Sequence, residues 1–349
     1  MAFSNKSYTE SIRKNCTRTL TVIMTHRESG FASELNLALF AVLYAAETNR
    51  TFHFDGHFWL YGNWSDFFDS PSDCELPTNV TAATMLGNRT ADERQPHLFT
   101  GRYVDWSRLL QHKQPADIFL VKAKALRTIW HVTMEIRDLV LQQMRNLSLL
   151  ANDSEACTRL HEEGGPCDLE NVKTVLFIGA HVRRGDKHLE AHEQSIEKYV
   201  AALDQLGCDL LLLTEANNSS LRRRCSRRAT RAENSWSDFE FPFPVFINTD
   251  DMQKVIPQIR LIRPRWNLIY STPPVVLKGF DALHFDELPL AVRKLHTIDL
   301  IINLELLRRA NRVVCTHSSN IARLLALLRD PRWPLDSMRS LDVGWHPGK

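Results

Sequence analysis

Between residues 172 and 329 the chain alternates short apolar runs with amphipathic stretches, and this alternation restricts the fold more than any other feature. Apolar runs rich in β-branched residues predict strands at 172–182, 209–214, 244–248, 267–270 and 312–315. Helical spacing between and after these runs predicts helices at 195–206, 255–262, 291–309 and 320–329. Strand–helix alternation of this kind builds a parallel, doubly wound sheet. We therefore expect a Rossmann-like fold for this half of the chain.

The first half of the chain is less regular. Its apolar pattern predicts a short apolar segment at 20–24, a helix at 31–46, a strand at 51–54 and helical structure at 116–150. Residues 59–102 have no clear period and are expected to form irregular loops, and the polar stretch 148–168 is the best linker candidate. The expected organisation is α/β throughout, with an N-terminal domain over residues 1–170 and a C-terminal domain over 171–349.

The end of the predicted strand 172–182 carries the strongest functional signal. It delivers a cluster of polar side chains to one point: His181, Arg183, Arg184, Asp186 and Lys187. In an open α/β sheet, ligands bind at the carboxyl ends of the strands. The planar arginine fork suits bidentate contact with phosphate oxygens, so the segment favours a phosphate-bearing ligand. The alternative is a surface turn with an internal Arg–Asp ion pair.

Charge and hydropathy argue against two classes of partner. The formal net charge is +2, whereas a nucleic-acid-binding domain would concentrate more positive charge in one region. An arginine-rich run at 221–228 is better explained as a solvated insertion, because it lies between two sequons and a polar loop. The longest apolar stretch, 37–46, is far shorter than the ~20 residues of a membrane span. The first residues also lack the apolar core of a signal peptide.

N-glycosylation sequons are more frequent than chance predicts. Asn-x-Ser/Thr triplets begin at Asn5, Asn15, Asn49, Asn63, Asn79, Asn88, Asn146, Asn152, Asn217 and Asn218. Chance would supply roughly two or three among 18 Asn residues. The excess indicates a protein of the Golgi lumen or a secreted protein whose leader is missing from this sequence. The alternative is that polar loops are simply rich in Asn and Ser.

The seven cysteines weakly favour the same compartment. Six of them can form three bridges and leave one free thiol. Close sequence neighbours favour Cys157–Cys167 and Cys208–Cys225, which leaves Cys16 and Cys74 as a third pair. No two cysteines have CxxC spacing, so a structural zinc site is not expected.

The segment His-Val-Arg-Arg-Gly-Asp-Lys, 181–187, resembles the signature of the α1,6-fucosyltransferases and of their nodulation and protein O-fucosyltransferase relatives. Further segments resemble the family in the same order: Gly30–Phe68, Ser195–Tyr199, Val245–Asp251 and Val313–Asn320. The resemblance extends over about residues 20–330, which is most of the chain. It implies a GT-B-like fold, with two α/β domains facing each other across a cleft and the C-terminal one binding a nucleotide sugar.

The resemblance also implies an activity. It is the inverting transfer of fucose from GDP-fucose to a glycan or glycoprotein acceptor, most specifically α1,6 to an N-glycan core GlcNAc, without a metal or other cofactor. Arg183 and Arg184 would neutralise charge on the departing GDP, and Glu190 would be the base, with Glu193 as the alternative. His181 would contact guanine. The other donor-site candidates are Asp186, Lys187, Asp250, Asp251, Thr316, Ser318, Ser319 and Asn320.

Three of these candidates also have an interpretation that does not depend on the family resemblance. Ser318, Ser319 and Asn320 precede an amphipathic helix, where hydroxyls and N–H groups can hold a pyrophosphate or simply cap the helix. Asp250 and Asp251 are adjacent carboxylates, which point to opposite faces of a strand, so we do not expect them to bind a metal together.

The sequence departs from the family pattern at two positions. Where the family has an Asp that helps to bind guanine, an ungapped count reaches Asn303, with Asp299 one helical turn earlier. Ala322 replaces a Cys that would pair with the last-motif Cys, so Cys315 is expected to be the free thiol. Residues 207–243 have no clear family counterpart. The alternatives to the main prediction are a protein O-fucosyltransferase and a catalytically degenerate relative that binds a nucleotide or glycan.

Overall fold

The computed structural model describes residues 16–24, 30–57, 59–75, 77, 80–81, 83–87, 91–101, 114–151, 169–184, 192–214, 225, 241–272, 282–329 and 337–345. Contacts within the chain divide it into two compact units. Unit 1 contains Met1–Ile136, Ala282–Ile298 and His346–Lys349, and unit 2 contains Arg137–Asp281 and Asp299–Trp345. Each unit holds one parallel sheet, which confirms the predicted α/β class. The domain boundary predicted at residue 170 and the cleft between domains stay predictions.

The sheet of unit 1 has three parallel strands in the order β2-β1-β3. They are β1 (Thr19–Ile23), β2 (Thr51–Asp55) and β3 (His97–Thr100). Helix α2 (Phe31–Glu47) joins β1 to β2 and buries Leu35, Leu39 and Val42, the apolar stripe expected from the sequence. Helix α4 (Pro115–Ile129) packs against α2, and its Pro occupies the first turn, where a missing N–H breaks no helical bond.

The interior of unit 1 beside α2 is aromatic. The rings of Phe31 and Trp59 stack with their centroids 5.6 Å apart, and Tyr61 meets Phe31 edge-on at 5.3 Å. Trp64, in the short 3-10 helix η1 (Trp64–Asp66), stacks on Phe54 at 3.9 Å. All five side chains are buried. These rings therefore fill the core of the unit and are not available as an exposed platform for a sugar.

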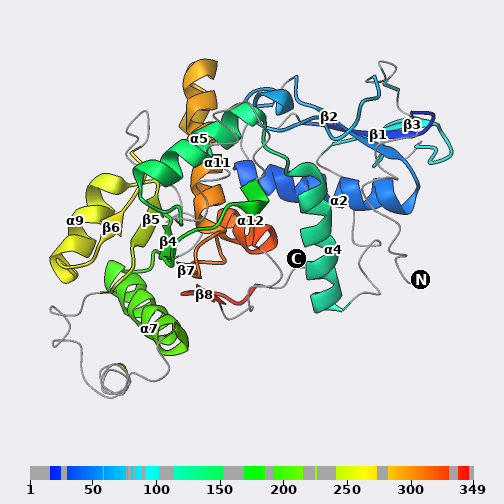
Figure 1. The fold of residues 1–349 in the computed structure, drawn as a ribbon. Coiled ribbons are helices and arrows are strands. Elements are labelled where there is room, and N and C mark those ends of the chain that lie inside the picture. The colour runs from blue at the N-terminus through cyan, green and yellow to red at the C-terminus, as the bar shows by residue number, and fades with distance from the viewer. Residues whose placement is uncertain are drawn as a thin grey trace. The chain divides into compact units, whose positions relative to one another are not determined.

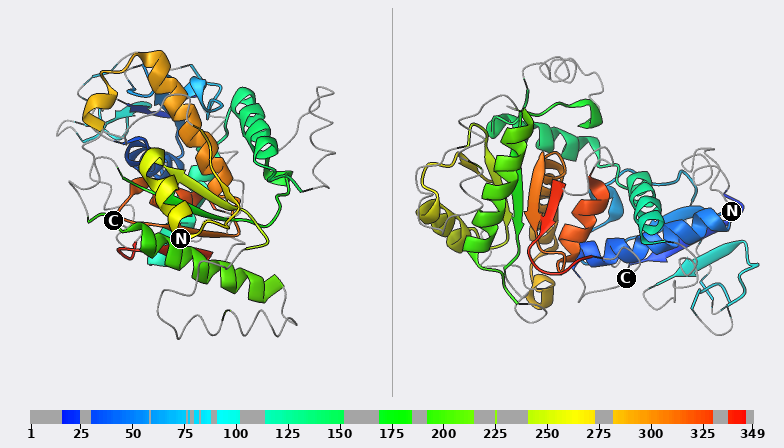
Figure 2. Two further views of the ribbon diagram at one scale, coloured as in Figure 1. Left: turned by 90° about the vertical axis from the view of Figure 1, so that its left-hand side faces the viewer. Right: turned by 90° about the horizontal axis from the view of Figure 1, so that it is seen from below.

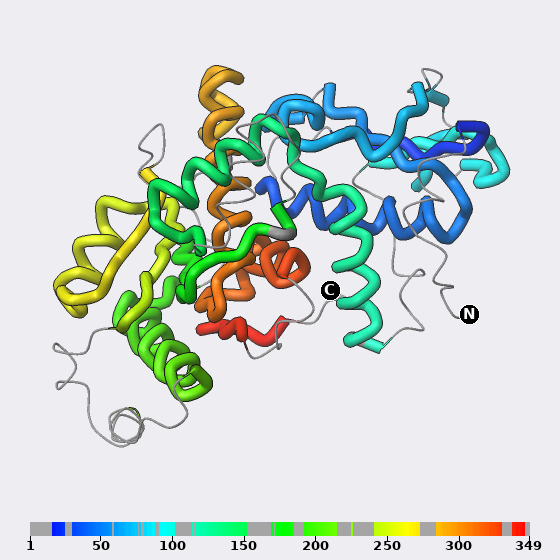
Figure 3. The backbone as a smooth tube through the Cα atoms, in the orientation of Figure 1, coloured from blue at the N-terminus to red at the C-terminus, as the bar shows by residue number. Residues whose placement is uncertain are grey.

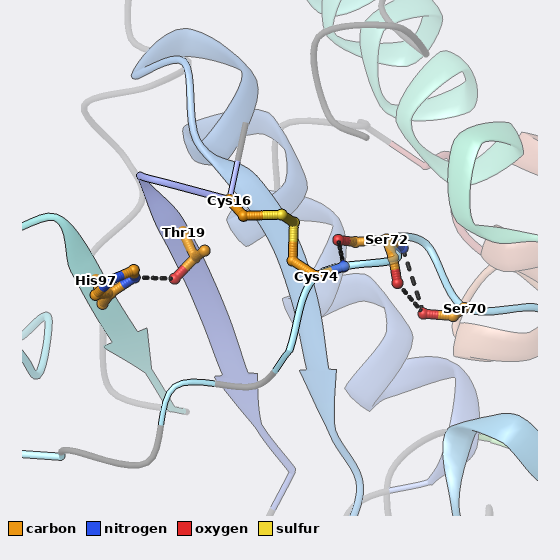
Figure 4. The surroundings of a disulfide bond; sticks show 6 residues. All are labelled: Cys16, Thr19, Ser70, Ser72, Cys74 and His97. Atoms are coloured by element: carbon orange, nitrogen blue, oxygen red, sulfur yellow. Dashed lines mark hydrogen bonds between the residues drawn. A yellow bond between two sulfur atoms is a disulfide. The ribbon is translucent and has the colours of Figure 1, made fainter. Parts of the chain in front are cut away.

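A disulfide ties the start of β1 to the loop that follows η1. Figure 4 shows Cys16 bonded to Cys74 beside β1, close to the hydrogen bond of 3.0 Å between Thr19 and His97 that links β1 to β3. A second disulfide joins Cys208 to Cys225. Both were predicted as pairs. Cys315 is a free, buried thiol, as expected, and Cys157 and Cys167 lie outside the described residues.

The sheet of unit 2 has five parallel strands in the order β6-β5-β4-β7-β8 (Figure 1). They are β4 (Ile178–Val182), β5 (Val245–Thr249), β6 (Leu268–Ile269), β7 (Arg312–Cys315) and β8 (Met338–Ser340). This is the Rossmann-like parallel sheet that the sequence predicts. Side chains from alternate positions of β4 and β5 pack with α7 (Ile196–Thr214) and α9 (Met252–Ile262) in one apolar core.

The opposite face of this sheet carries α11 (Leu290–Leu307) and α12 (Asn320–Leu328). A methyl group added to Gly179 of β4 would lie 2.8 Å from Leu307, so the absent side chain lets α11 approach the strand closely. Arg329, at the end of α12, donates to the carbonyls of Leu307 and Ala310, which joins α12 to the end of α11. The right-hand view of Figure 2 shows α7 and α12 on opposite sides of the strands between them. The sheet is therefore doubly wound.

Some predictions of local structure were wrong. The predicted strand 209–214 is the last part of α7, because an apolar run of six residues fits a buried helix as well as a strand. Gly207 lies inside this helix, and a Cβ there would clash with the ring of Phe241. The helical stretch 116–150 divides into α4 and α5 (Met134–Asn146), with a break at 130–133.

Short elements account for the remaining differences. β3 interrupts the stretch predicted as irregular, and β8 and α10 (Ala282–Phe285) were not predicted. Each has three or four residues, too few to show a period. Among the described residues, no helix is long and apolar enough to cross a membrane.

Candidate functional site

The sheet of unit 2 changes its winding direction between β4 and β7. The chain passes from β4 to β5 and β6 on one side, then returns to β7 and β8 on the other. Loops that leave such neighbouring strands in opposite directions open a crevice at their carboxyl ends, where ligands bind in doubly wound sheets. The segment 181–184 at the end of β4 and the segment 316–319 after β7 both lie at this point. The fold thus brings together the two predicted phosphate-binding segments.

Asp250, just after β5, holds the arginine turn. One carboxylate oxygen accepts a hydrogen bond of 2.7 Å from the backbone N–H of Arg184, and the other forms an ion pair with the guanidinium of Arg183. The register of β4 and β5 places Thr249 beside Val182, so the residues that follow the two strands meet. The internal Arg–Asp pair considered as the alternative for this turn therefore exists. It orients Arg183 at the carboxyl edge of the sheet.

The side chain of Arg184 is buried and multiply held. Its Nε forms an ion pair of 2.7 Å with Glu193, its Nη1 donates to the carbonyl of Gln194 at 2.8 Å, and its guanidinium lies 5.9 Å from the ring centre of Tyr199. Its Nη2 has no partner among the described residues. Glu193, the second candidate for the catalytic base, is thus engaged with Arg184. A fixed guanidinium whose Nη2 still carries two N–H donors is suited to an incoming anion.

His181, on β4, is a neutral side chain with an unused nitrogen. Its Nδ1 lies 3.2 Å from the amide nitrogen of Asn248, its partner residue across the β4–β5 ladder. Since the amide donates, Nδ1 accepts and the ring proton is on Nε2. Burial, together with the charge of Arg183, lowers the pKa of His181 to about 3. The Nε2–H group is buried without a hydrogen-bond partner, so a ligand with an acceptor atom at this point would satisfy it.

Asp299 and Asn303 lie on the same side of the sheet as His181. α11 leads through a short turn into β7, a path that Figure 3 traces, so α11 runs antiparallel to the strands. Leu307 lies at Gly179, two residues before His181. Asn303 is one turn nearer the carboxyl edge than Leu307, which is about 6 Å along the helix, while His181 is about 6.6 Å along β4 from Gly179. Asn303 is therefore level with His181, and Asp299 lies beyond it.

The two α11 residues are bonded to each other. The amide nitrogen of Asn303 donates to the Asp299 carboxylate at 3.0 Å and to its backbone carbonyl at 2.9 Å. Burial raises the pKa of Asp299 to about 6, although the hydrogen bond from Asn303 opposes the shift. The structure thus joins the Asn303 amide to a carboxylate one helical turn away on α11.

The loop before α12 contains an acid that sequence reasoning did not select. Asp342, after β8, accepts from the backbone N–H of Ser318 at 3.4 Å, from the Ser340 hydroxyl at 2.9 Å and from the Val343 N–H at 2.7 Å. Burial raises the pKa of Asp342, but hydrogen bonds from the Ser318 and Ser340 hydroxyls and from these N–H groups leave it lowered overall. A carboxylate therefore already uses donors of the predicted phosphate-binding loop.

The remaining predicted residues have separate roles. Asp251 caps α9 through the N–H of Lys254 at 3.3 Å, so the adjacent acids Asp250 and Asp251 bind different partners. Thr316 is buried and bonded to Tyr199, and Ser319 is the buried N-cap residue of α12. Asn320 is exposed. Asp186, Lys187 and Glu190 lie outside the described residues. No three His, Cys, Asp or Glu side chains of the described ranges form a potential metal site.

Sequence reasoning missed four residues that support this site: Asn248, Gln194, Tyr199 and Asp342. Asn248 carried a usable signal, because it immediately precedes the predicted Thr-Asp-Asp strand end. Gln194 acts through its backbone carbonyl, which no side-chain motif can indicate. Asp342 follows a three-residue strand that the apolar pattern does not show.

Comparisons with known proteins give structural matches only. No model of a known protein family matches, and no curated protein matches. NodZ α-1,6-fucosyltransferase soaked with GDP-fucose has 15% sequence identity and a TM-score of 0.48, over 89% of this chain and 93% of that chain. The selenomethionine form of fucosyltransferase NodZ from Bradyrhizobium has 16% identity and a TM-score of 0.43, over 90% and 93%. A variant of Arabidopsis thaliana FUT1 in complex with GDP has 12% identity and a TM-score of 0.49, over 93% and 72%. At these values the likeness does not assign an activity to this chain.

Proposed function

We propose that the chain is an inverting, metal-independent glycosyltransferase that moves fucose from GDP-fucose to a glycan acceptor. The observation that carries the proposal is the pair Arg183 and Arg184 at the β4–β7 switch point, fixed by Asp250 and Glu193. The diphosphate would lie at this edge of the unit 2 sheet. The motif that contains the two arginines is also the one that resembles the fucosyltransferases.

The arginines fit the charge that the reaction develops. As the bond between fucose C1 and the β-phosphate oxygen breaks, negative charge accumulates on that oxygen. Guanidinium groups already held in place stabilise this charge without reorganising, and one such donor is typically worth about 10²–10³ in rate. Arg184 offers its Nη2, and Arg183 offers a guanidinium that Asp250 holds at the end of β4.

The guanine base would be recognised by one hydrogen-bond donor and one hydrogen-bond acceptor of the protein. Guanine presents acceptors at N7 and O6 and donors at N1 and N2. The Nε2–H of His181 matches an acceptor, and the Asp299 carboxylate matches two donors. Asn303 holds that carboxylate by its amide. In this proposal the Asp299 carboxylate, which has two acceptor oxygens, contacts guanine, because the Asn303 side chain has only one.

Inversion requires the acceptor hydroxyl to attack C1 from the face opposite the diphosphate, with a base to take its proton. Glu190 remains our candidate for this base. For the acceptor we propose the N-glycan core GlcNAc in α1,6 linkage, on the motif resemblance. The two disulfides fit an oxidising compartment, and we propose the Golgi lumen or secretion as the location.

Isothermal titration with GDP, GDP-fucose, UDP and ADP tests the donor site. We expect GDP and GDP-fucose to bind, UDP and ADP to bind much more weakly, and Arg183→Ala to lose binding. Arg260→Ala is the matched control, because Arg260 is an exposed arginine on α9 of the same unit. Equal binding of all three diphosphates would reject guanine recognition. Binding without donor hydrolysis or transfer would identify a degenerate relative.

A further inference from the structure

One sequon of the chain lies at a cavity. Asn146 is the last residue of α5, and Leu147 and Ser148 complete the triplet. All three residues line a cavity of about 820 Å³ in unit 2. The two other sequon asparagines that the structure describes, Asn49 and Asn63, are exposed like Asn146 but do not line the cavity. Asn146 therefore differs from these sequons in its position at a cavity, although all of them satisfy the same sequence rule.

The cavity lies at the amino edge of the unit 2 sheet, at the end opposite the arginines. Its walls are the residues that precede β4, β5 and β6 together with the end of α7: Val175, Leu176, Pro242, Phe243, Pro244, Asn267, Leu211 and Thr214, with Ile269 of β6 itself. Most of these side chains are apolar, and Leu176 is 42% exposed. An open apolar cavity with a few polar groups at its rim is the usual character of a ligand pocket.

The backbone at Ser148 is strained in a way that the sequon explains. The N–H of Leu149 bonds to the carbonyl of Met144, and that of Ser148 bonds to Arg145, which is the helix-ending motif that normally places Gly at this position. Ser148 has φ 54°, a left-handed conformation that costs a residue with a side chain about 1 kcal/mol relative to Gly. A glycine would end α5 more stably, but only Ser or Thr supplies the hydroxyl that a sequon requires.

We propose that Asn146 carries an N-linked glycan and that the first sugars of this glycan occupy the cavity. The co-reactant is a polyprenyl-diphosphate-linked oligosaccharide, used by the oligosaccharide transferase of the secretory pathway. The amide nitrogen of Asn146 forms a bond to C1 of the first GlcNAc as the bond from C1 to the diphosphate oxygen breaks. The amide loses one proton, and the polyprenyl diphosphate leaves with the electron pair. No oxidation or reduction takes place.

A tethered sugar suits this cavity better than a free ligand would. The acceptor asparagine is part of the wall, so the first GlcNAc enters without the entropic cost of bringing a second molecule. The C–H face and acetyl methyl group of GlcNAc can pack against apolar walls such as Leu176 and Phe243. Its hydroxyls can remain at the rim, where Ser148 and Thr214 are polar. The glycan would then cover apolar surface that the chain leaves exposed.

The test uses the full chain secreted from a eukaryotic host with an added leader. Mass spectrometry of the peptide that contains Asn146, before and after peptide N-glycosidase, should show a glycan. Release of this glycan from the folded protein should be about tenfold slower than from the denatured protein, because the core sugars must leave the cavity first. Release at Asn49 or Asn63, where these are modified, should not slow in this way.

Leu176→Asp distinguishes binding of the glycan in the cavity from glycosylation of Asn146. This variant keeps the sequon but makes one wall of the cavity charged, so Asn146 should remain modified while its glycan is released as fast as in the denatured chain. Asn146→Gln should lose only this glycan. An unmodified Asn146 in the secreted protein would overturn the proposal, whatever the state of the other sequons. A modified Asn146 with equal release rates in folded and denatured protein would overturn the seating in the cavity.

Discussion

The two edges of the unit 2 sheet have opposite chemistry although the same strands build them. At the carboxyl edge, Arg183 and Arg184 are each held by an acid, and Asp342 gathers the donors of the Ser318 loop. At the amino edge, the residues that enter the strands are mainly apolar, and they enclose a cavity. In a parallel sheet all carboxyl ends meet at one edge, so polar strand ends accumulate there into a site. The opposite edge is left free for packing, or for a covering group.

The edges also differ in where their unfavourable features lie. At the carboxyl edge the unfavourable features are in side chains: the buried His181 Nε2 has no partner, and the Asp299 carboxylate is partly buried. At the amino edge the unfavourable feature is the left-handed backbone conformation of Ser148. Buried polar groups are suited to meet a ligand that supplies the missing bonds, whereas a strained turn is suited to hold one side chain in place. The predictions below test this contrast.

The largest effect is expected from Arg184→Ala. Loss of a fixed guanidinium at the leaving diphosphate should lower kcat/KM for fucosyl transfer about 10²–10³-fold. Arg184→Lys keeps the charge but loses the fork that reaches Glu193 and Gln194, so it should recover only part of this loss. Steady-state kinetics with GDP-fucose, with circular dichroism to confirm the fold, measures both.

Leu176→Ala supplies the comparison from the amino edge. It removes an exposed apolar side chain and should leave kcat/KM unchanged within about twofold, since an exposed substitution of this kind changes stability little. Equal losses in the Arg184 and Leu176 variants would show that the two edges are not functionally distinct.

The next effect concerns the pH dependence of stability. Burial raises the pKa of Asp299 to about 6, although the hydrogen bond from Asn303 opposes the shift, whereas an unfolded Asp titrates near 3.9. Because the folded pKa is the higher one, this group favours folding most below pH 4. Its contribution is lost as the pH rises through 6, by roughly 3 kcal/mol in all. Asp299→Asn should remove this component. The free energy of unfolding of the variant should therefore rise relative to that of wild type as the pH increases from 4 to 7.

Urea unfolding of wild type and Asp299→Asn at pH 4, 5, 6 and 7 checks this prediction, since other titrating groups cancel in the difference between the two proteins. Parallel stability curves would mean that the carboxylate of Asp299 is solvated and carries no such penalty.

A smaller effect is expected at Asp342. Its carboxylate accepts the Ser318 N–H and adds negative charge to the loop where we place the diphosphate. Asp342→Asn should therefore strengthen GDP binding by about 3–10-fold, the value of one hydrogen bond or weak charge interaction. Titration calorimetry of the folded variant measures this, and Ser340→Ala controls for loosening of the loop. Weaker GDP binding in Asp342→Asn would instead show that the acid orders the loop for its ligand.

Periodicity predicted the long elements of the fold but not the short ones. α2, α11 and β7 were predicted within a residue or two, because burial imposes a period on the sequence over several turns or along a whole buried strand. The strand predicted at 209–214 was wrong, since these residues continue α7, in which Gly207 accommodates the ring of Phe241. Contacts of that kind join distant segments and have no local signature.

The candidate site shows the same limit. Its charged residues were found at strand ends, where the sequence places them beside apolar runs: Arg183, Arg184, Asp250 and Ser318. Two further contacts of the site were not found, because Asn248 meets His181 and Asp342 meets the Ser318 loop through strand order and register. Sequence indicates which residues are unusual for a strand end, and the sheet decides which of them meet.

The smallest effect tests the strained turn at the amino edge. In protein made without glycans, Ser148→Gly should raise the free energy of unfolding by about 0.5–1 kcal/mol, because Gly adopts φ 54° without steric cost. Ser148→Ala removes the same hydroxyl but keeps the Cβ, so it should show no such gain. Urea unfolding of the three unglycosylated proteins measures the difference. A gain in both variants would trace the cost to the hydroxyl rather than to the backbone, and the sequon would no longer explain why a serine stands where glycine fits best.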